Sequence, residues 1–178
     1  MINSLQVAIK FNNLLPDGQR PELTSDYEGF FHLVKLEGTV EKSVIEYIIR
    51  DHDRRKFDDK KALMIDIASL LNREYSPGTI SLDIQDQYYN MREKIEPVFH
   101  ILEIARRAIE DLEIQPKIIP VRGGTDGSRL SYMGLPCPNI FAGGHNFHGK
   151  YEYIPLESMI AATNVIIRIA ELYAGHQA

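Results

Sequence analysis

The sequence predicts a protein of mixed structure, with a small α+β layer in its first half and an α/β arrangement in its second half. Two observations predict this division. In the first half, helical periodicity alternates with runs rich in β-branched residues, whereas in the second half short apolar runs alternate with helices and glycine-rich loops. The chain has 178 residues, 44% of them hydrophobic, and this is enough to bury a substantial core.

In the first half, apolar residues at three- and four-residue spacing predict one helix over 3–15 and a second over 51–73. Between these helices, the runs 30–36 and 44–49 are rich in β-branched and aromatic residues, and they predict a β-hairpin. Apolar and polar residues then alternate over 79–87. This alternation predicts a strand that is buried on one face only.

In the second half, the same helical spacing predicts helices over 97–112 and 156–172 and a helical turn over 128–133. Thr125 and Asp126 precede this turn and are expected to cap it. Two short apolar runs, 117–121 and 139–142, predict strands buried on both faces, as in a parallel sheet.

Composition excludes several classes of partner. The formal net charge is −5 and no basic block occurs, so we expect neither nucleic acid nor an anionic membrane as a partner. The apolar runs are too short to span a bilayer, and no secretory signal opens the sequence. Cys137 is the single cysteine and cannot form an internal disulfide, which indicates a reducing cytoplasm.

Candidate functional residues concentrate in the glycine-rich loops of the second half. His148 follows a predicted strand and is a candidate metal ligand or general base; the alternative is a solvent-exposed loop histidine. Arg122 could bind a carboxylate through its forked donors, and the alternative is a surface ion pair. The run 123–127 is a weak candidate for nucleotide binding, because neither dinucleotide-binding nor phosphate-loop spacing is present.

Several blocks carry a resemblance to a known family. They are Arg-Gly-Gly-Thr-Asp-Gly at 122–127, the run 133–144 around Pro-Cys-Pro-Asn, and Asn-Phe-His-Gly-Lys at 146–150, with further blocks at 27–32, 47–54 and 88–93. In this order they closely resemble the C-terminal part of the peptidase T family, the cytosolic tripeptide aminopeptidases of the di-zinc exopeptidase superfamily. The resemblance covers essentially the whole chain.

The resemblance implies a two-part organisation. Residues 1–91 resemble the lid domain, lacking its first strand, through which these enzymes form homodimers. Residues 92–178 resemble the C-terminal segment of the α/β zinc-exopeptidase catalytic domain. The implied function is that of a cytoplasmic metallo-aminopeptidase that releases the N-terminal residue of tripeptides.

The resemblance also assigns individual residues. The last metal ligand of the family falls on His148, and its substrate-binding arginines fall on Arg50 and Arg122. The remaining metal ligands and the catalytic glutamate belong to the N-terminal half of the family, which the match does not cover. We therefore expect two zinc ions in the complete enzyme, no catalytic residue and no tightly bound zinc in this fragment, and no activity from the fragment alone.

An alternative function is a non-catalytic, lid-type module kept for dimerisation or interaction. Incubation of the isolated chain with a tripeptide and zinc or cobalt separates the two hypotheses, since only a self-sufficient site would turn the peptide over.

Overall fold

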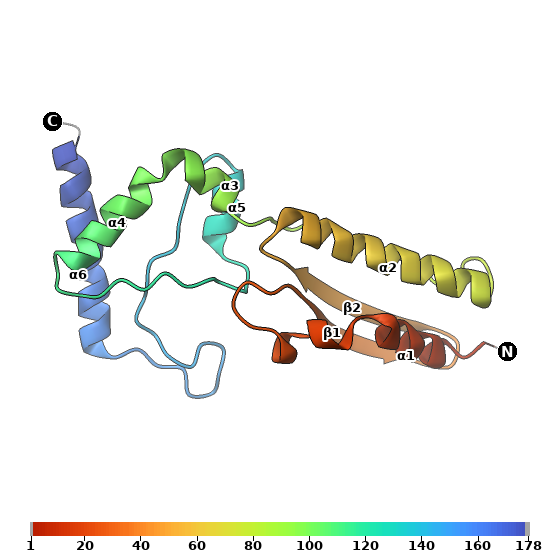
Figure 1. The fold of residues 1–178 in the computed structure, drawn as a ribbon. Coiled ribbons are helices and arrows are strands. Elements are labelled where there is room, and N and C mark those ends of the chain that lie inside the picture. The colour runs from red at the N-terminus through yellow and green to blue at the C-terminus, as the bar shows by residue number, and fades with distance from the viewer. Residues whose placement is uncertain (1, 177–178) are drawn as a thin grey trace. The chain divides into compact units, whose positions relative to one another are not determined.

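The structure is a computed structural model that describes residues 2–176, and it divides into two compact units (Figure 1). The first unit is Met1–Asn90 with Pro120–Gly124, and the second is Met91–Ile119 with Thr125–Ala178. Helices and one small sheet make up the fold, in agreement with the predicted α+β class. Among the described residues, no helix combines the length and the apolar character needed to cross a bilayer.

The first unit consists of helix α1 (Ser4–Leu14), strands β1 (Phe30–Gly38) and β2 (Ser43–Arg50), and helix α2 (Arg54–Glu74). A polar side chain caps the N-terminus of each helix. Asn3 accepts a hydrogen bond from the backbone N–H of Leu5, and Asp53 accepts one from Lys56 at 2.9 Å. Each cap satisfies a donor that the first helical turn leaves free, so the two predicted helices are confirmed.

The predicted hairpin is also confirmed. Strands β1 and β2 are antiparallel, with Phe30 opposite Arg50 at one end and Gly38 opposite Ser43 at the other. The register shifts between Leu33 and Lys35, as a β-bulge does. The hairpin thereby places Arg50 at the end of a strand, next to the segment that leads into α2.

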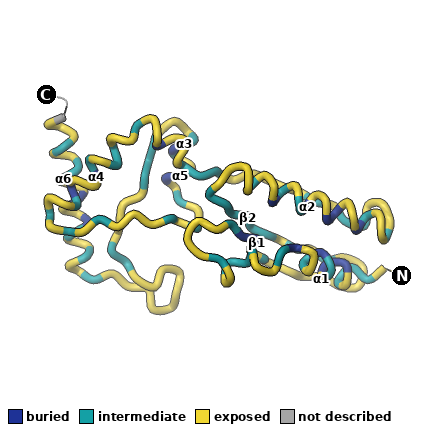
Figure 2. The backbone as a smooth tube through the Cα atoms, viewed as in Figure 1, coloured by how far each residue is buried: buried dark blue, intermediate teal, exposed yellow. Residues whose placement is uncertain are grey.

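One face of the hairpin and the two helices form the core of the first unit (Figure 2). The buried members of this cluster come from α1 and the residue after it, from β1, and from α2: Phe11, Leu15, Phe31, Met64, Ile67, Ala68 and Leu71. Leu71 has no exposed surface. Removing this apolar surface from water stabilises the unit and anchors the hairpin against α2.

The strand predicted over 79–87 is wrong. Apart from a bend at Thr79, these residues have no regular secondary structure, and the sheet of the described chain contains only β1 and β2. The alternation does reflect burial on one face, because Ile80 and Leu82 pack against the core of the first unit. A strand also needs a partner for its backbone groups, and hydropathy alone does not supply one.

The second unit contains α3 (Arg92–Ile95), α4 (His100–Glu110), α5 (Asp126–Tyr132) and α6 (Leu156–His176). Helices α4 and α6 pack against each other. The His100 ring nitrogen lies 3.1 Å from the Tyr173 hydroxyl, and Arg168 donates to Asp111 at 2.7 Å. The predicted helices of the second half are therefore confirmed.

The two strands predicted for the second half, over 117–121 and 139–142, are wrong. Neither segment forms a strand in the described chain, and Ile118 and Ile119 are 86% and 61% exposed. Their apolar character favours a strand, but a buried strand requires neighbours on both edges and cover on both faces. The described residues provide neither for these two segments.

Candidate functional site

The two arginines singled out in the sequence both lie next to Phe30, at one end of the hairpin. Arg50 is the last residue of β2, and its cross-strand partner is Phe30, the first residue of β1. The guanidinium carbon of Arg122 lies 4.8 Å from the centroid of the Phe30 ring. The first unit thus brings Arg50 and Arg122 to the same aromatic residue, although they are distant in sequence.

Arg50 is half-buried and contacts three groups. Its guanidinium carbon lies 4.8 Å from the centroid of the Tyr88 ring, as in a cation–π pair. It donates to the backbone carbonyl of Ile49 at 3.0 Å and to the side-chain oxygen of Gln87 at 3.4 Å. The charge of Arg50 is therefore oriented by an aromatic face and neutral acceptors.

Arg122 is held by the backbone and side chain of Thr24. It donates to the Thr24 carbonyl at 2.7 Å and to the Thr24 hydroxyl. Its Nε is buried and has no hydrogen-bond partner within residues 2–176. A ligand that bound both terminal nitrogens of Arg122 would share them with the Thr24 oxygens or replace those oxygens.

A buried ion pair supports this end of the hairpin. Asp51, which follows Arg50, accepts a hydrogen bond from Lys60 of α2 at 2.9 Å. A methyl group at position 29 would lie 2.0 Å from the same Asp51 oxygen, so only glycine fits beside it. This close approach fixes the backbone on either side of Phe30 and Arg50.

His52 is a titratable residue near Asp51 and Arg122. Its ring packs edge-on against Tyr27 at a centroid distance of 5.1 Å, and Asn90 donates to its backbone carbonyl at 3.1 Å. Burial lowers the pKa of His52 below its ordinary value; Asp51 opposes this effect and Arg122 adds to it. In the sequence, nothing points to His52 beyond its place in a resembling block.

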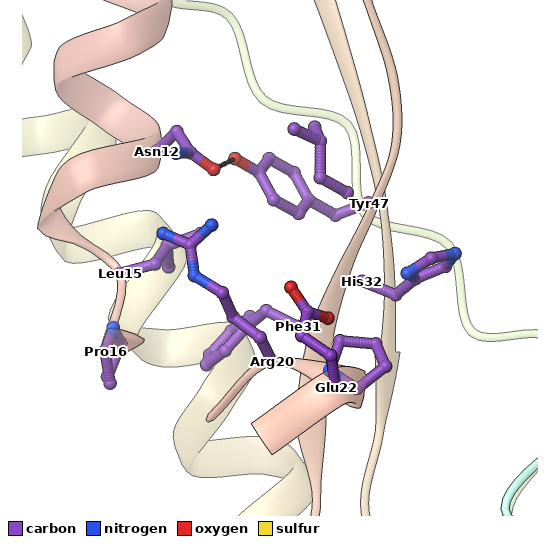
Figure 3. Close-up of a pocket in the computed structure, with 10 residues that line it drawn as sticks. Asn12, Leu15, Pro16, Arg20, Glu22, Phe31, His32 and Tyr47 are labelled. Atoms are coloured by element: carbon purple, nitrogen blue, oxygen red, sulfur yellow. Dashed lines mark hydrogen bonds between the residues drawn. The ribbon is translucent and has the colours of Figure 1, made fainter. Parts of the chain in front are cut away.

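A cavity of about 250 Å³ lies elsewhere in the first unit, between the end of α1 and the hairpin (Figure 3). The Tyr47 hydroxyl donates to Asn12 at 2.9 Å, and Arg20 donates to Asp17 at 2.8 Å. Burial raises the pKa of Tyr47 to about 12, and the Arg20 charge opposes that shift. Since Tyr47 and Arg20 already have partners, we assign no ligand to this cavity.

His148 lies in the second unit, in an exposed loop with a defined backbone. His145 and Tyr153 form an isolated antiparallel bridge at the base of this loop. The backbone N–H of His148 donates to the Glu152 carboxylate at 2.9 Å, and His148 has a positive φ of 65°. The imidazole is thus presented on a constrained backbone and not on an unstructured tail.

The described residues do not by themselves fit a zinc centre. Within residues 2–176, no three His, Cys, Asp or Glu side chains are grouped so that they could hold a metal ion. A catalytic zinc takes about three protein ligands, and the resemblance assigns only His148 as a ligand. A complete zinc site would therefore need ligands in addition to His148.

No family model matches the chain, but individual proteins are very similar to it. It is 56% identical over 174 residues to peptidase T of Alkaliphilus oremlandii, which is 98% of this chain and 42% of that protein. Peptidase T of Bacillus subtilis is 56% identical over 173 residues, again 42% of its length. The chain therefore spans about two fifths of the curated relatives that it matches.

Two solved structures share the fold. A tripeptidase from Staphylococcus aureus matches with a TM-score of 0.63 and 17% identity, over 94% of this chain and 44% of that one. An aminopeptidase PepT from Bacillus cereus also has a TM-score of 0.63, with 19% identity and the same coverage. Along nearly its whole length, this chain is therefore similar in sequence to the C-terminal portion of peptidase T.

Proposed function

We propose that the chain is the C-terminal portion of a metal-dependent aminopeptidase that removes the N-terminal residue of tripeptides. In this proposal Arg50 and Arg122 bind the peptide and His148 contributes one metal ligand. The observation that carries the proposal is the 56% identity to peptidase T over 98% of the chain. The position of both arginines next to Phe30 supports a shared role for them.

The chemistry of Arg50 and Arg122 suits the binding of a small peptide's carboxylate. A guanidinium stays charged at all physiological pH values and donates two parallel hydrogen bonds to a carboxylate. Arg50 lies against an aromatic ring and is only half-exposed, so a bound carboxylate would be partly withdrawn from water. The attraction between the two charges would be stronger there than on an open surface.

The metal belongs to the proposed complete enzyme. Two zinc ions would polarise the scissile carbonyl and supply the attacking hydroxide when bound. Within this chain, the imidazole of His148 is the group proposed to bind one of them, and its backbone N–H bond to Glu152 fixes the loop that carries it. The other ligands would come from polypeptide outside the matched two fifths.

By resemblance to the family, we further propose that residues 1–91 form a lid that pairs with a second copy. Residues 92–178 would then complete the catalytic domain. The cysteine content supports a cytoplasmic location, because Cys137 is free and the sequence carries no second cysteine to pair with it.

A chimeric enzyme tests the proposal. The 174 matched residues of the Alkaliphilus peptidase T are replaced by those of this chain, and hydrolysis of trialanine is measured with zinc or cobalt. We expect the chimera to hydrolyse trialanine and the 178-residue chain alone to be inactive. The His148→Ala variant of the chimera should lose both bound metal and activity, whereas His145→Ala, in the same loop, should keep them. A folded, metal-loaded chimera without tripeptidase activity would contradict the proposal.

A further inference from the structure

Tyr88 lies between Arg50 and the segment that carries Arg122. One side of its ring faces the Arg50 guanidinium carbon at 4.8 Å from the ring centroid. Its hydroxyl end faces Gly124, two residues after Arg122. Tyr88 therefore contacts both parts of the chain that carry the proposed peptide-binding arginines.

The contact with Gly124 leaves no room for a side chain. A methyl group at position 124 would lie 2.2 Å from the Tyr88 hydroxyl oxygen and 2.7 Å from the ring carbon that bears it. The neighbouring Gly123 differs, because a methyl group there would have nothing within 4 Å. Neither glycine has a positive φ, so an alanine at either position tests space and not backbone strain.

The Tyr88 hydroxyl is not what holds the ring in place. The oxygen is buried, and within residues 2–176 it has no hydrogen-bond partner. A buried hydroxyl without a partner costs free energy, so it cannot be the group that stabilises this arrangement. The ring makes the contact with Arg50, and its carbon atoms at the hydroxyl end also lie close to Gly124, so phenylalanine would keep both ring contacts.

We infer that Tyr88 is a positioning residue for Arg50: its ring, wedged against Gly124, holds the Arg50 guanidinium in the orientation that receives a peptide carboxylate. The inference rests on the proposed function of Arg50. Tyr88 need not touch the ligand. The Tyr88 ring holds one face of the guanidinium before a ligand arrives, so the Arg50 side chain loses less conformational entropy when a carboxylate binds.

The test uses the 178-residue chain labelled with ¹⁵N and two readouts. The first is the ring-current shift of the Arg50 Nε–H resonance, which reports the aromatic ring over the guanidinium without any ligand. The second is the Kd for trialanine. The variants are Tyr88→Leu, Tyr88→Phe, Gly124→Ala and the matched control Gly123→Ala, with Arg50→Ala as the reference for a lost guanidinium.

We expect Tyr88→Leu to abolish the ring-current shift and to weaken trialanine binding about three- to tenfold, the range of a partly desolvated cation–π contact. Gly124→Ala should reduce both readouts because it displaces the ring. Tyr88→Phe and Gly123→Ala should match the unaltered chain. This rescue by phenylalanine separates positioning by the ring from any role of the hydroxyl.

Two results would overturn the inference: an unchanged Arg50 resonance in Tyr88→Leu, or trialanine binding that Arg50→Ala weakens and Tyr88→Leu does not. If Tyr88→Phe loses affinity as Tyr88→Leu does, the hydroxyl is a ligand contact and the inference is wrong. If Arg50→Ala binds trialanine as well as the unaltered chain, the proposed function of Arg50 fails. The Arg50 resonance still reports in that case whether Tyr88 holds the guanidinium.

Discussion

Asp51 accepts a hydrogen bond from Lys60 at 2.9 Å, and both side chains are largely shielded from solvent: 2% of the Asp51 side chain and 11% of the Lys60 side chain are exposed. The pair joins the end of β2 to α2, immediately beside Arg50. Charges so deeply buried are tolerated only when each has its partner. The pair therefore makes the end of the hairpin sensitive to single substitutions.

Removing Asp51 alone should be costly. Asp51→Ala leaves the Lys60 charge buried without its partner, and we expect the free energy of unfolding to fall by about 3–5 kcal/mol. Urea denaturation measures this. The control is Glu110→Ala, which removes an exposed partner of Arg106 and should cost under about 1 kcal/mol. The double variant Asp51→Ala/Lys60→Met should regain part of the loss, and equal stability of the single and control variants would contradict this account.

Stability should fall as the solution is acidified, because of His52. Burial lowers the pKa of His52 in the folded chain below its ordinary value of 6.5, so the unfolded chain binds the proton more tightly. Its contribution to stability is fully present above pH 6.5 and is lost as the pH falls through the lower, folded-state pKa. Urea denaturation over roughly pH 5 to 8 should show this slope, and His52→Gln should flatten it. An identical slope in His52→Gln would argue against His52 as the source.

Arg50 should matter for catalysis in the chimeric enzyme and not for its folding. Arg50→Ala removes a charge-assisted, forked contact to the peptide carboxylate, and kcat/KM for trialanine should fall about ten- to a hundredfold. Arg50→Lys should recover only part of this, since lysine keeps the charge but not the fork. Melting temperature and metal content serve as controls and should change little. Near-normal kinetics for both variants would leave Arg50 as a structural residue.

The isolated chain should bind zinc weakly. His148 is the single proposed ligand in this chain, and tight zinc sites use three or four. Calorimetric titration should show no stoichiometric binding tighter than that of an ordinary surface histidine. Submicromolar binding of one zinc, abolished by His148→Ala, would contradict this prediction and would imply ligands that the described residues do not group together.

The first unit should self-associate. Its sheet has only two strands in the described chain, so the outer edges of β1 and β2 both carry backbone groups without a sheet partner. Val34, Leu36 and Val44 on these strands are between 39% and 50% exposed. Exposed edges of this kind pair with other strands. Sedimentation velocity should show concentration-dependent dimers that Val44→Lys weakens, and a strict monomer at high concentration would count against the prediction.

The local elements could be predicted from the sequence, and the non-local ones could not. Helices α2 and α6 and the hairpin follow from periodicity and composition over short windows, and Thr125 caps α5 by accepting from the Ser128 N–H, as predicted. The segments over 79–87, 117–121 and 139–142 have the apolar patterns of strands, but a strand also depends on a neighbour that no local window describes.

The candidate site shows the same limit. Arg50 and Arg122 are recognisable as individual residues, through their resemblance to a family and their chemistry. The position of both arginines next to Phe30 and the wedge of Tyr88 against Gly124 depend on contacts between segments far apart in sequence. The buried pair of Asp51 with Lys60 spans only nine residues, but it depends on how α2 packs after the hairpin. Residue type and spacing do not encode such contacts.

The segment after α2, residues 79–87, has one further property, which concerns the exchange of its amide hydrogens with solvent. Asn72 of α2 accepts from the Ile80 N–H at 2.8 Å and donates to the Ile80 carbonyl at 2.9 Å, so one side-chain amide takes the place of a neighbouring strand. The amides that follow, up to residue 87, make no backbone hydrogen bond within residues 2–176. Deuterium should therefore exchange rapidly at these amides and slowly at Ile80, whose backbone is hydrogen-bonded to Asn72 of α2.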